Sequence, residues 1–227
     1  MRWSGTFFSF GAPALVLFVT ARVAVPAVSQ QLGLPPVLWF VTFTACYVFA
    51  PLLVIALLRL RAEALEDVAV RRERLRFRAL TRTDWLWVLG AVALASLASA
   101  GILALLRALG VAEIVPTFLA NSGEQALAPR DLTIAWIVFG VISVAAQEVL
   151  WRGVYLPRQE QAVGSPAWIA NAAGWMLFCA PLGWALLLAL LPVLIAVPYV
   201  AQRRSNSLAG AMIHAGAALV ALIYGQM

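Results

Sequence analysis

The residues best suited to chemistry are a glutamate and an arginine four positions apart in a long apolar segment. They lie in the run Gln147-Glu148-Val149-Leu150-Trp151-Arg152-Gly153. A spacing of four places two side chains on one face of a helix, so we expect an ion pair. An ionisable residue at membrane depth costs about 2.5–3.5 kcal/mol on insertion scales and is therefore a candidate functional residue. A second carboxylate at position 147 would make an acid/base centre possible, but this chain has glutamine there.

His214 is the other candidate for chemistry, and it is the single histidine of the chain. A histidine facing a bundle interior can be structural or catalytic, and its sequence context leaves both roles open. One histidine cannot form the two-histidine zinc site of a metalloprotease, and we expect no metal and no cofactor. Ser207 lies about 10 Å from His214 along a helix axis, too far for a nucleophile–base hydrogen bond.

The composition places these residues in a membrane protein. Apolar residues make up 63% of the chain and charged residues 11%. Soluble domains have about 45–50% apolar and about 25% charged residues. The sequence therefore predicts an all-α fold, a polytopic membrane helix bundle in which residues 1–227 form a single integral-membrane domain.

We expect about seven transmembrane helices. Asp84 and Asp131 are expected to cap the third and fourth, Pro181-Leu182-Gly183 to separate the fifth from the sixth, and Pro192 and Pro198 to kink the sixth. Residues 108–130 are expected to form an exposed loop with a turn at 121–123. The expected spans are 7–27, 36–58, 85–106, 131–155, 166–180, a sixth from after Gly183 to 201, and a seventh from Asn206 or Ser207 to 223.

The arginines predict the orientation. The chain has no lysine, and eight of its arginines lie between Arg59 and Arg82, a pattern typical of a cytoplasmic loop on anionic lipid. We expect a bacterial cytoplasmic membrane, with the N-terminus cytoplasmic and the C-terminus outside. The lipid bilayer is the expected partner. The same segment has no series of aromatic side chains for base stacking, so no nucleic-acid role is expected.

Two further features have structural interpretations. Cys46 and Cys179 fall inside apolar segments and are expected to be core residues, without a disulfide. The first apolar segment begins like a signal peptide but lacks a small-x-small cleavage site, so we expect a retained span.

Three motifs resemble those of the CPBP family, the CAAX-processing and bacteriocin-processing intramembrane proteases, also called the Abi family. The family pattern is Glu-Glu-x-x-x-Arg on one helix, Phe-x-x-x-His on the next, and His-x-x-x-Asn on a later one. The resemblance covers about residues 131–225. It retains Glu148 and Arg152 as the pairing residues, Phe178 in the second motif and His214 in the third.

The resemblance also identifies three altered positions. In the family, the first glutamate activates water and the two histidines and the asparagine complete the site. Here Gln147 replaces that glutamate, Leu182 replaces the first histidine, and Ala218 replaces the asparagine. Glutamine cannot act as a general base, and leucine supplies neither a metal ligand nor an oxyanion donor.

These substitutions predict a catalytically inactive relative that acts as a binding, scaffold or structural subunit with other membrane proteins. The alternative is an active glutamate-dependent intramembrane endopeptidase that uses Glu148 and His214 on a transmembrane or prenylated peptide. Such an enzyme would have to free Glu148 from Arg152, whose charge lowers its basicity. A transporter component is a third possibility, but few polar residues line the spans.

Overall fold

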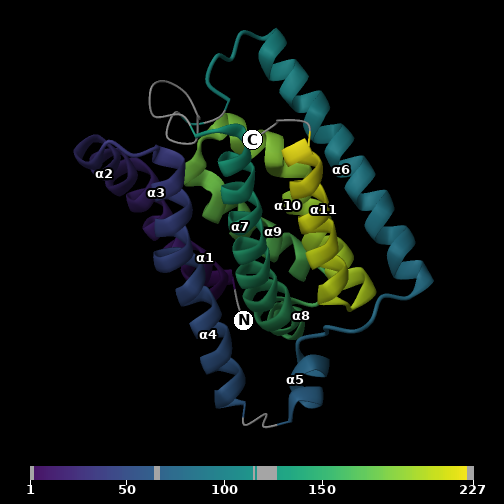
Figure 1. Ribbon diagram of the computed structural model, residues 1–227. Coiled ribbons are helices and arrows are strands. Elements are labelled where there is room, and N and C mark those ends of the chain that lie inside the picture. The colour runs from purple at the N-terminus through teal and green to yellow at the C-terminus, as the bar shows by residue number, and fades with distance from the viewer. Residues whose placement is uncertain (1–2, 64–66, 115, 117–126, 224–227) are drawn as a thin grey trace.

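The computed structural model describes residues 3–63, 67–114, 116 and 127–223, and this part of the chain is an all-helical bundle (Figure 1). Five helical rods are long and apolar enough to cross a membrane: Gly5–Leu32, Pro36–Ala62, Arg82–Ala108, Pro129–Val163 and Trp184–Arg204. Two shorter apolar helices, Ala167–Leu182 and Ser207–Ile223, complete the bundle. The predicted membrane bundle of about seven helices is confirmed, although two of its helices are shorter than the roughly 20 residues of a full span.

Several rods contain more than one helical segment. The α-helices are α1 Trp3–Val19, α2 Val25–Leu32, α3 Pro36–Phe43, α4 Ala50–Ala62, α5 Val68–Arg74, α6 Arg82–Ala108, α7 Pro129–Gln147, α8 Leu156–Val163, α9 Ala167–Cys179, α10 Trp184–Arg204 and α11 Ser207–Ile223.

Wider π-helical segments join the α-helices within three rods, at Thr20–Ala24, Thr44–Phe49 and Glu148–Tyr155. A proline follows the end of each segment by two positions, at Pro26, Pro51 and Pro157. Proline lacks a backbone N–H and its ring clashes with the carbonyl four residues earlier. A wider turn before the proline relieves that clash, so each rod continues where an ideal α-helix would break.

This continuity corrects the predicted end of the fourth span. The spacing predicted a helix ending near Tyr155, but the rod runs on through Pro157 to Val163. The break at Pro181-Leu182-Gly183 is confirmed, because a 3₁₀ turn covers Ala180–Leu182 and Gly183 has a φ of 107°. α10 continues through Pro192 and Pro198, and the kinks there stay a prediction. The predicted turn at 121–123 lies outside the described residues.

The two predicted aspartate caps are wrong in detail. α6 is capped by Thr81, and Asp84 is the third helical residue, which completes a reciprocal capping box with Thr81. α7 has Ala128 at its N-cap, and Asp131 lies in the first turn. Both carboxylates still lie in the first turn of a helix, where the helix dipole favours negative charge. This preference explains why an aspartate marks the start of each helix in the sequence.

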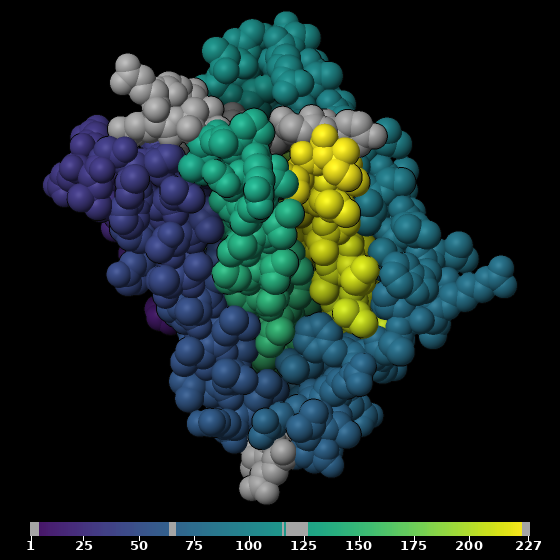
Figure 2. Space-filling view, viewed as in Figure 1, coloured from purple at the N-terminus to yellow at the C-terminus, as the bar shows by residue number. Residues whose placement is uncertain are grey.

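The rods pack closely where glycines allow it. A Cβ on Gly174 of α9 would lie 2.5 Å from the Phe10 ring of α1, and one on Gly216 of α11 would lie 2.9 Å from Val92 of α6. Figure 2 shows α4, α7 and α11 side by side across one face. The arginine-rich segment around α5 and the end of α6 lie at opposite ends of the bundle (Figure 1).

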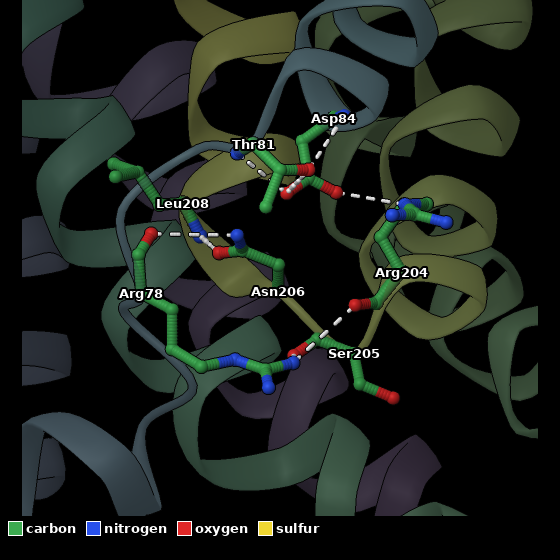
Figure 3. A network of polar contacts seen from close by, with 7 residues as sticks. All are labelled: Arg78, Thr81, Asp84, Arg204, Ser205, Asn206 and Leu208. Atoms are coloured by element: carbon green, nitrogen blue, oxygen red, sulfur yellow. Dashed lines mark hydrogen bonds and ion pairs between the residues drawn. The ribbon is translucent and has the colours of Figure 1, made fainter.

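Polar contacts fix the start of α11, the helix that carries His214 (Figure 3). Asp84 pairs with Arg204 at 2.7 Å, and the Arg78 guanidinium donates to the Ser205 carbonyl. The Asn206 side-chain amide donates to the Arg78 carbonyl at 3.3 Å. The segment before α6 therefore holds the turn between α10 and α11, which sets the position of His214.

Candidate functional site

Glu148 and Arg152 lie in the π-helical segment that continues α7. Seven of its eight residues are buried, and π-helical turns inside α-helices often occur at functional sites. The start of α11 packs on this segment, because the Ser207 hydroxyl donates to the Arg152 carbonyl at 3.1 Å. Ser207 therefore fixes the start of α11 against the π-helical segment.

The ion pair expected from the sequence spacing is present and fully buried. Arg152 Nη1 lies 3.2 Å from Glu148 Oε1, and the side chains are 0% and 1% exposed. The guanidinium carbon also lies 3.8 Å from the ring centre of Trp175, a close cation–π contact. In the described part of the chain, the guanidinium nitrogens of Arg152 have no hydrogen-bond partner. Glu148 Oε2 has none either. Charge attraction and ring stacking, rather than aligned hydrogen bonds, therefore hold Arg152.

His214 joins this pair from α11. Its Nδ1 lies 2.9 Å from Glu148 Oε1, and its ring packs edge-on against Trp175 with the ring centres 4.9 Å apart. A carboxylate paired with arginine can only accept a hydrogen bond, so Nδ1 carries the proton. In the neutral ring, Nε2 is then left as an acceptor.

Gln147 is held by the same tryptophan. Trp175 Nε1 donates to Gln147 Oε1 at 2.8 Å. An indole N–H is only a donor, so the contact fixes the amide orientation, with the oxygen toward Trp175 and the NH₂ group away from it. Gln147, Glu148, Arg152, Trp175 and His214 are called the interior cluster below.

A cavity of about 580 Å³ lies beside the interior cluster, among α6, α7, α9, α10 and α11. Its walls are largely apolar. They include five positions of the family motifs: Gln147, Phe178, Leu182, His214 and Ala218. Glu148 and Arg152 lie outside the lining, behind His214. The retained histidine and the three altered positions therefore line one cavity. The retained ion pair lies outside that cavity.

Sequence reasoning missed the tryptophan and the amides that support the site. Asn171 donates to the Trp151 carbonyl at 3.1 Å and to Gln159 Oε1 at 2.8 Å, and Gln159 donates to Thr6 at 2.9 Å. Buried amides among apolar helices commonly bond across helices, so Asn171 within an apolar segment was an available signal. In the described ranges, no three His, Cys, Asp or Glu side chains gather as a metal site.

The fold and the cavity define a helical membrane protein with a largely apolar cavity among its helices. A family model described as Rce1-like, type II CAAX prenyl endopeptidase Rce1-like, matches residues 129–220. These residues carry a CAAX protease-like region, which confirms the resemblance predicted from the motifs over 131–225. Neither a search of curated proteins nor a search of solved structures gave a match.

Proposed function

We propose that this chain is a CAAX protease-like membrane protein that binds a ligand or partner without hydrolysing it. The observation that carries the proposal is the makeup of the cavity wall. Gln147, Leu182 and Ala218 face the space where the family has a glutamate, a histidine and an asparagine. None of the three can take a proton from water near neutral pH.

The retained glutamate is poorly placed to replace the missing base. Glu148 is 1% exposed, outside the cavity lining, and one of its oxygens contacts both Arg152 and His214. A general base must reach the water that it activates, directly or through one bridging water. Glu148 serves instead as the anchor of Arg152 and His214, and the cavity keeps its shape as a binding site.

A second function, an active endopeptidase, is favoured by one observation. The contact between Glu148 and His214 orients the imidazole with Nε2 free for acid/base chemistry. In this alternative His214 transfers protons at the cavity and Glu148 stabilises its charged form. The missing oxyanion and water-positioning groups weigh against it, since such groups commonly contribute a factor of about 10²–10³ in rate.

Peptide cleavage separates the two functions. We expect no turnover of transmembrane or prenylated peptides by the purified protein in nanodiscs. The control is the triple variant Gln147→Glu, Leu182→His, Ala218→Asn, which rebuilds the family pattern and should show weak activity at best. Turnover by the natural sequence that disappears in both Glu148→Gln and His214→Gln would establish the endopeptidase instead.

The proposal extends to orientation and partners. The arginine-rich end of the bundle, with α5 and the end of α10, is assigned to the cytoplasm of a bacterial cell, which places the C-terminus outside. Cysteines introduced at Arg72 and at Leu109 should then react from opposite sides of the membrane. A binding subunit should also co-purify in fixed proportion with other membrane proteins after mild solubilisation, and purification only as a free monomer would count against that role.

A further inference from the structure

Two polar atoms beside Trp175 in the cavity wall have no protein partner. The hydroxyls of Ser96 and Ser99, two other lining residues, are buried without a partner as well. Gln147 Nε2 and His214 Nε2 have no hydrogen-bond partner in the part of the chain that the structure describes. Both residues line the cavity, and both contact Trp175. Both side chains therefore lie against the same tryptophan in a largely apolar wall.

The contacts behind these atoms fix what each can offer. Trp175 occupies the amide oxygen of Gln147, so its free nitrogen is a donor. Glu148 takes the proton-bearing nitrogen of His214, so the other ring nitrogen is an acceptor. A ligand atom that satisfies both must accept one hydrogen bond and donate another.

The charges around these two atoms cancel. Glu148 and Arg152 form a buried pair that contacts His214 from outside the cavity, and in the described ranges no Asp, Glu or Arg side chain lines the cavity. A charged ligand group would lose its hydration without gaining a counter-charge, which disfavours carboxylates, phosphates and amines. The remaining wall, from Leu103 and Leu190 to Leu222, suits a hydrocarbon chain.

We infer that the cavity binds a single-chain lipid with an uncharged hydroxyl head, which accepts from Gln147 and donates to His214. Resting on the proposed function, this inference names the ligand class of the non-hydrolytic site. A hydroxyl supplies a donor and an acceptor on one atom, whereas an ether or ester oxygen only accepts.

The primary test uses the unchanged protein, so folding of variants cannot confuse it. Protein in phosphatidylcholine nanodiscs is equilibrated with tritiated oleyl alcohol, and unlabelled oleyl alcohol, oleyl methyl ether, oleic acid and oleylamine compete. We expect the alcohol to compete about tenfold better than the ether, because the ether leaves the His214 acceptor unpaired. Equal competition by alcohol and ether, stronger competition by the acid or the amine, or retention no greater than in empty nanodiscs would overturn the inference.

Two variants locate the head group. His214→Phe removes the acceptor while keeping an aromatic ring against Trp175, and it should abolish the preference for alcohol over ether. Ser96→Ala changes another polar residue of the same cavity, whose hydroxyl is sealed by packing, and should leave the preference unchanged. The opposite result would place the head at Ser96 and overturn the assignment. A peptidase assay on the same preparation keeps the two ideas separate, since cleavage refutes the proposed function and a lost alcohol preference refutes only the ligand class.

Discussion

Two regions of the described chain hold ion pairs, and the two differ in burial and in hydrogen bonding. The interior cluster holds Glu148 and Arg152 at almost zero exposure, with an ion pair and a stacked ring but no aligned hydrogen bond to the guanidinium. The arginine-rich end holds partly exposed pairs with short contacts, here called the rim pairs. They are Glu63 with Arg74 and Arg158, Arg76 with Glu160, and Asp84 with Arg204.

The rim pairs have the shorter contacts, but the longer interior contact matters more for stability. A rim pair such as Arg76 and Glu160, at 2.6 Å, keeps 25% and 20% side-chain exposure, so water remains an alternative partner for part of each group and screens the pair. The longer interior contact has no such alternative, because either charge left alone would be stranded in a dry site. Burial therefore decides which pairs the fold cannot lose.

The largest expected effect comes from breaking the interior pair. Glu148→Gln and Arg152→Gln should each lower the free energy of unfolding by about 3–5 kcal/mol, because each leaves an uncompensated buried charge. The double variant should recover part of the loss. Denaturant unfolding in detergent micelles measures all three, with the rim variant Arg76→Gln as the matched control. Equal losses of stability in the interior and rim variants would show that burial does not decide which ion pairs the fold needs.

Packing in the interior should matter next. Gly174→Ala should cost about 1–3 kcal/mol, since a Cβ there would lie 2.5 Å from the Phe10 ring, which must move. Gly140→Ala in α7 is the control, because nothing lies within 4 Å of its added Cβ. Thermal unfolding of both proteins tests this. A Gly174→Ala protein as stable as the Gly140→Ala protein would show that α1 and α9 are not packed this closely.

Asp84 tests the boundary between the two regions. It belongs to a rim pair, but it is 4% exposed and also completes the capping box of α6. Asp84→Asn should cost about 1–2 kcal/mol, between the interior and rim values, and Thr81→Ala should cost about 1 kcal/mol. Chemical unfolding of both variants gives the numbers, and a loss at Asp84 no larger than at Arg76 would contradict this intermediate position.

The smallest expected effect is the pH dependence of Glu63. Burial raises its pKa, but hydrogen bonds from Arg74 and Arg158 and their charges outweigh burial, so the pKa lies below its ordinary 4.5. The stabilisation is therefore fully present above pH 4.5 and is lost as pH falls through the lowered pKa. Glu63→Gln should remove at most about 1 kcal/mol at neutral pH. Unfolding curves at several pH values should converge for the two proteins in acid, and a constant difference would contradict the assignment.

Local rules of the sequence predicted much of the fold. Apolar runs identified the rods, and Pro181-Leu182-Gly183 marked a break that the structure contains. Prediction failed where tertiary packing or backbone adjustment overrode a local rule. The fourth span was expected to end near Tyr155, yet a π-helical segment continues the helix through Pro157 to Val163.

The candidate site also has one part that the sequence predicted and one part that depends on tertiary packing. The sequence by itself determined the ion pair of Glu148 and Arg152, because a spacing of four on a helix brings two side chains together whatever surrounds them. Only the tertiary structure decided that His214, 66 residues from Glu148, would contact its carboxylate and that Trp175 would fix the amide of Gln147. Such contacts depend on how α9 and α11 pack against the π-helical segment. No local spacing contains that information, so the cavity and the contacts beside it emerged only from the packed bundle.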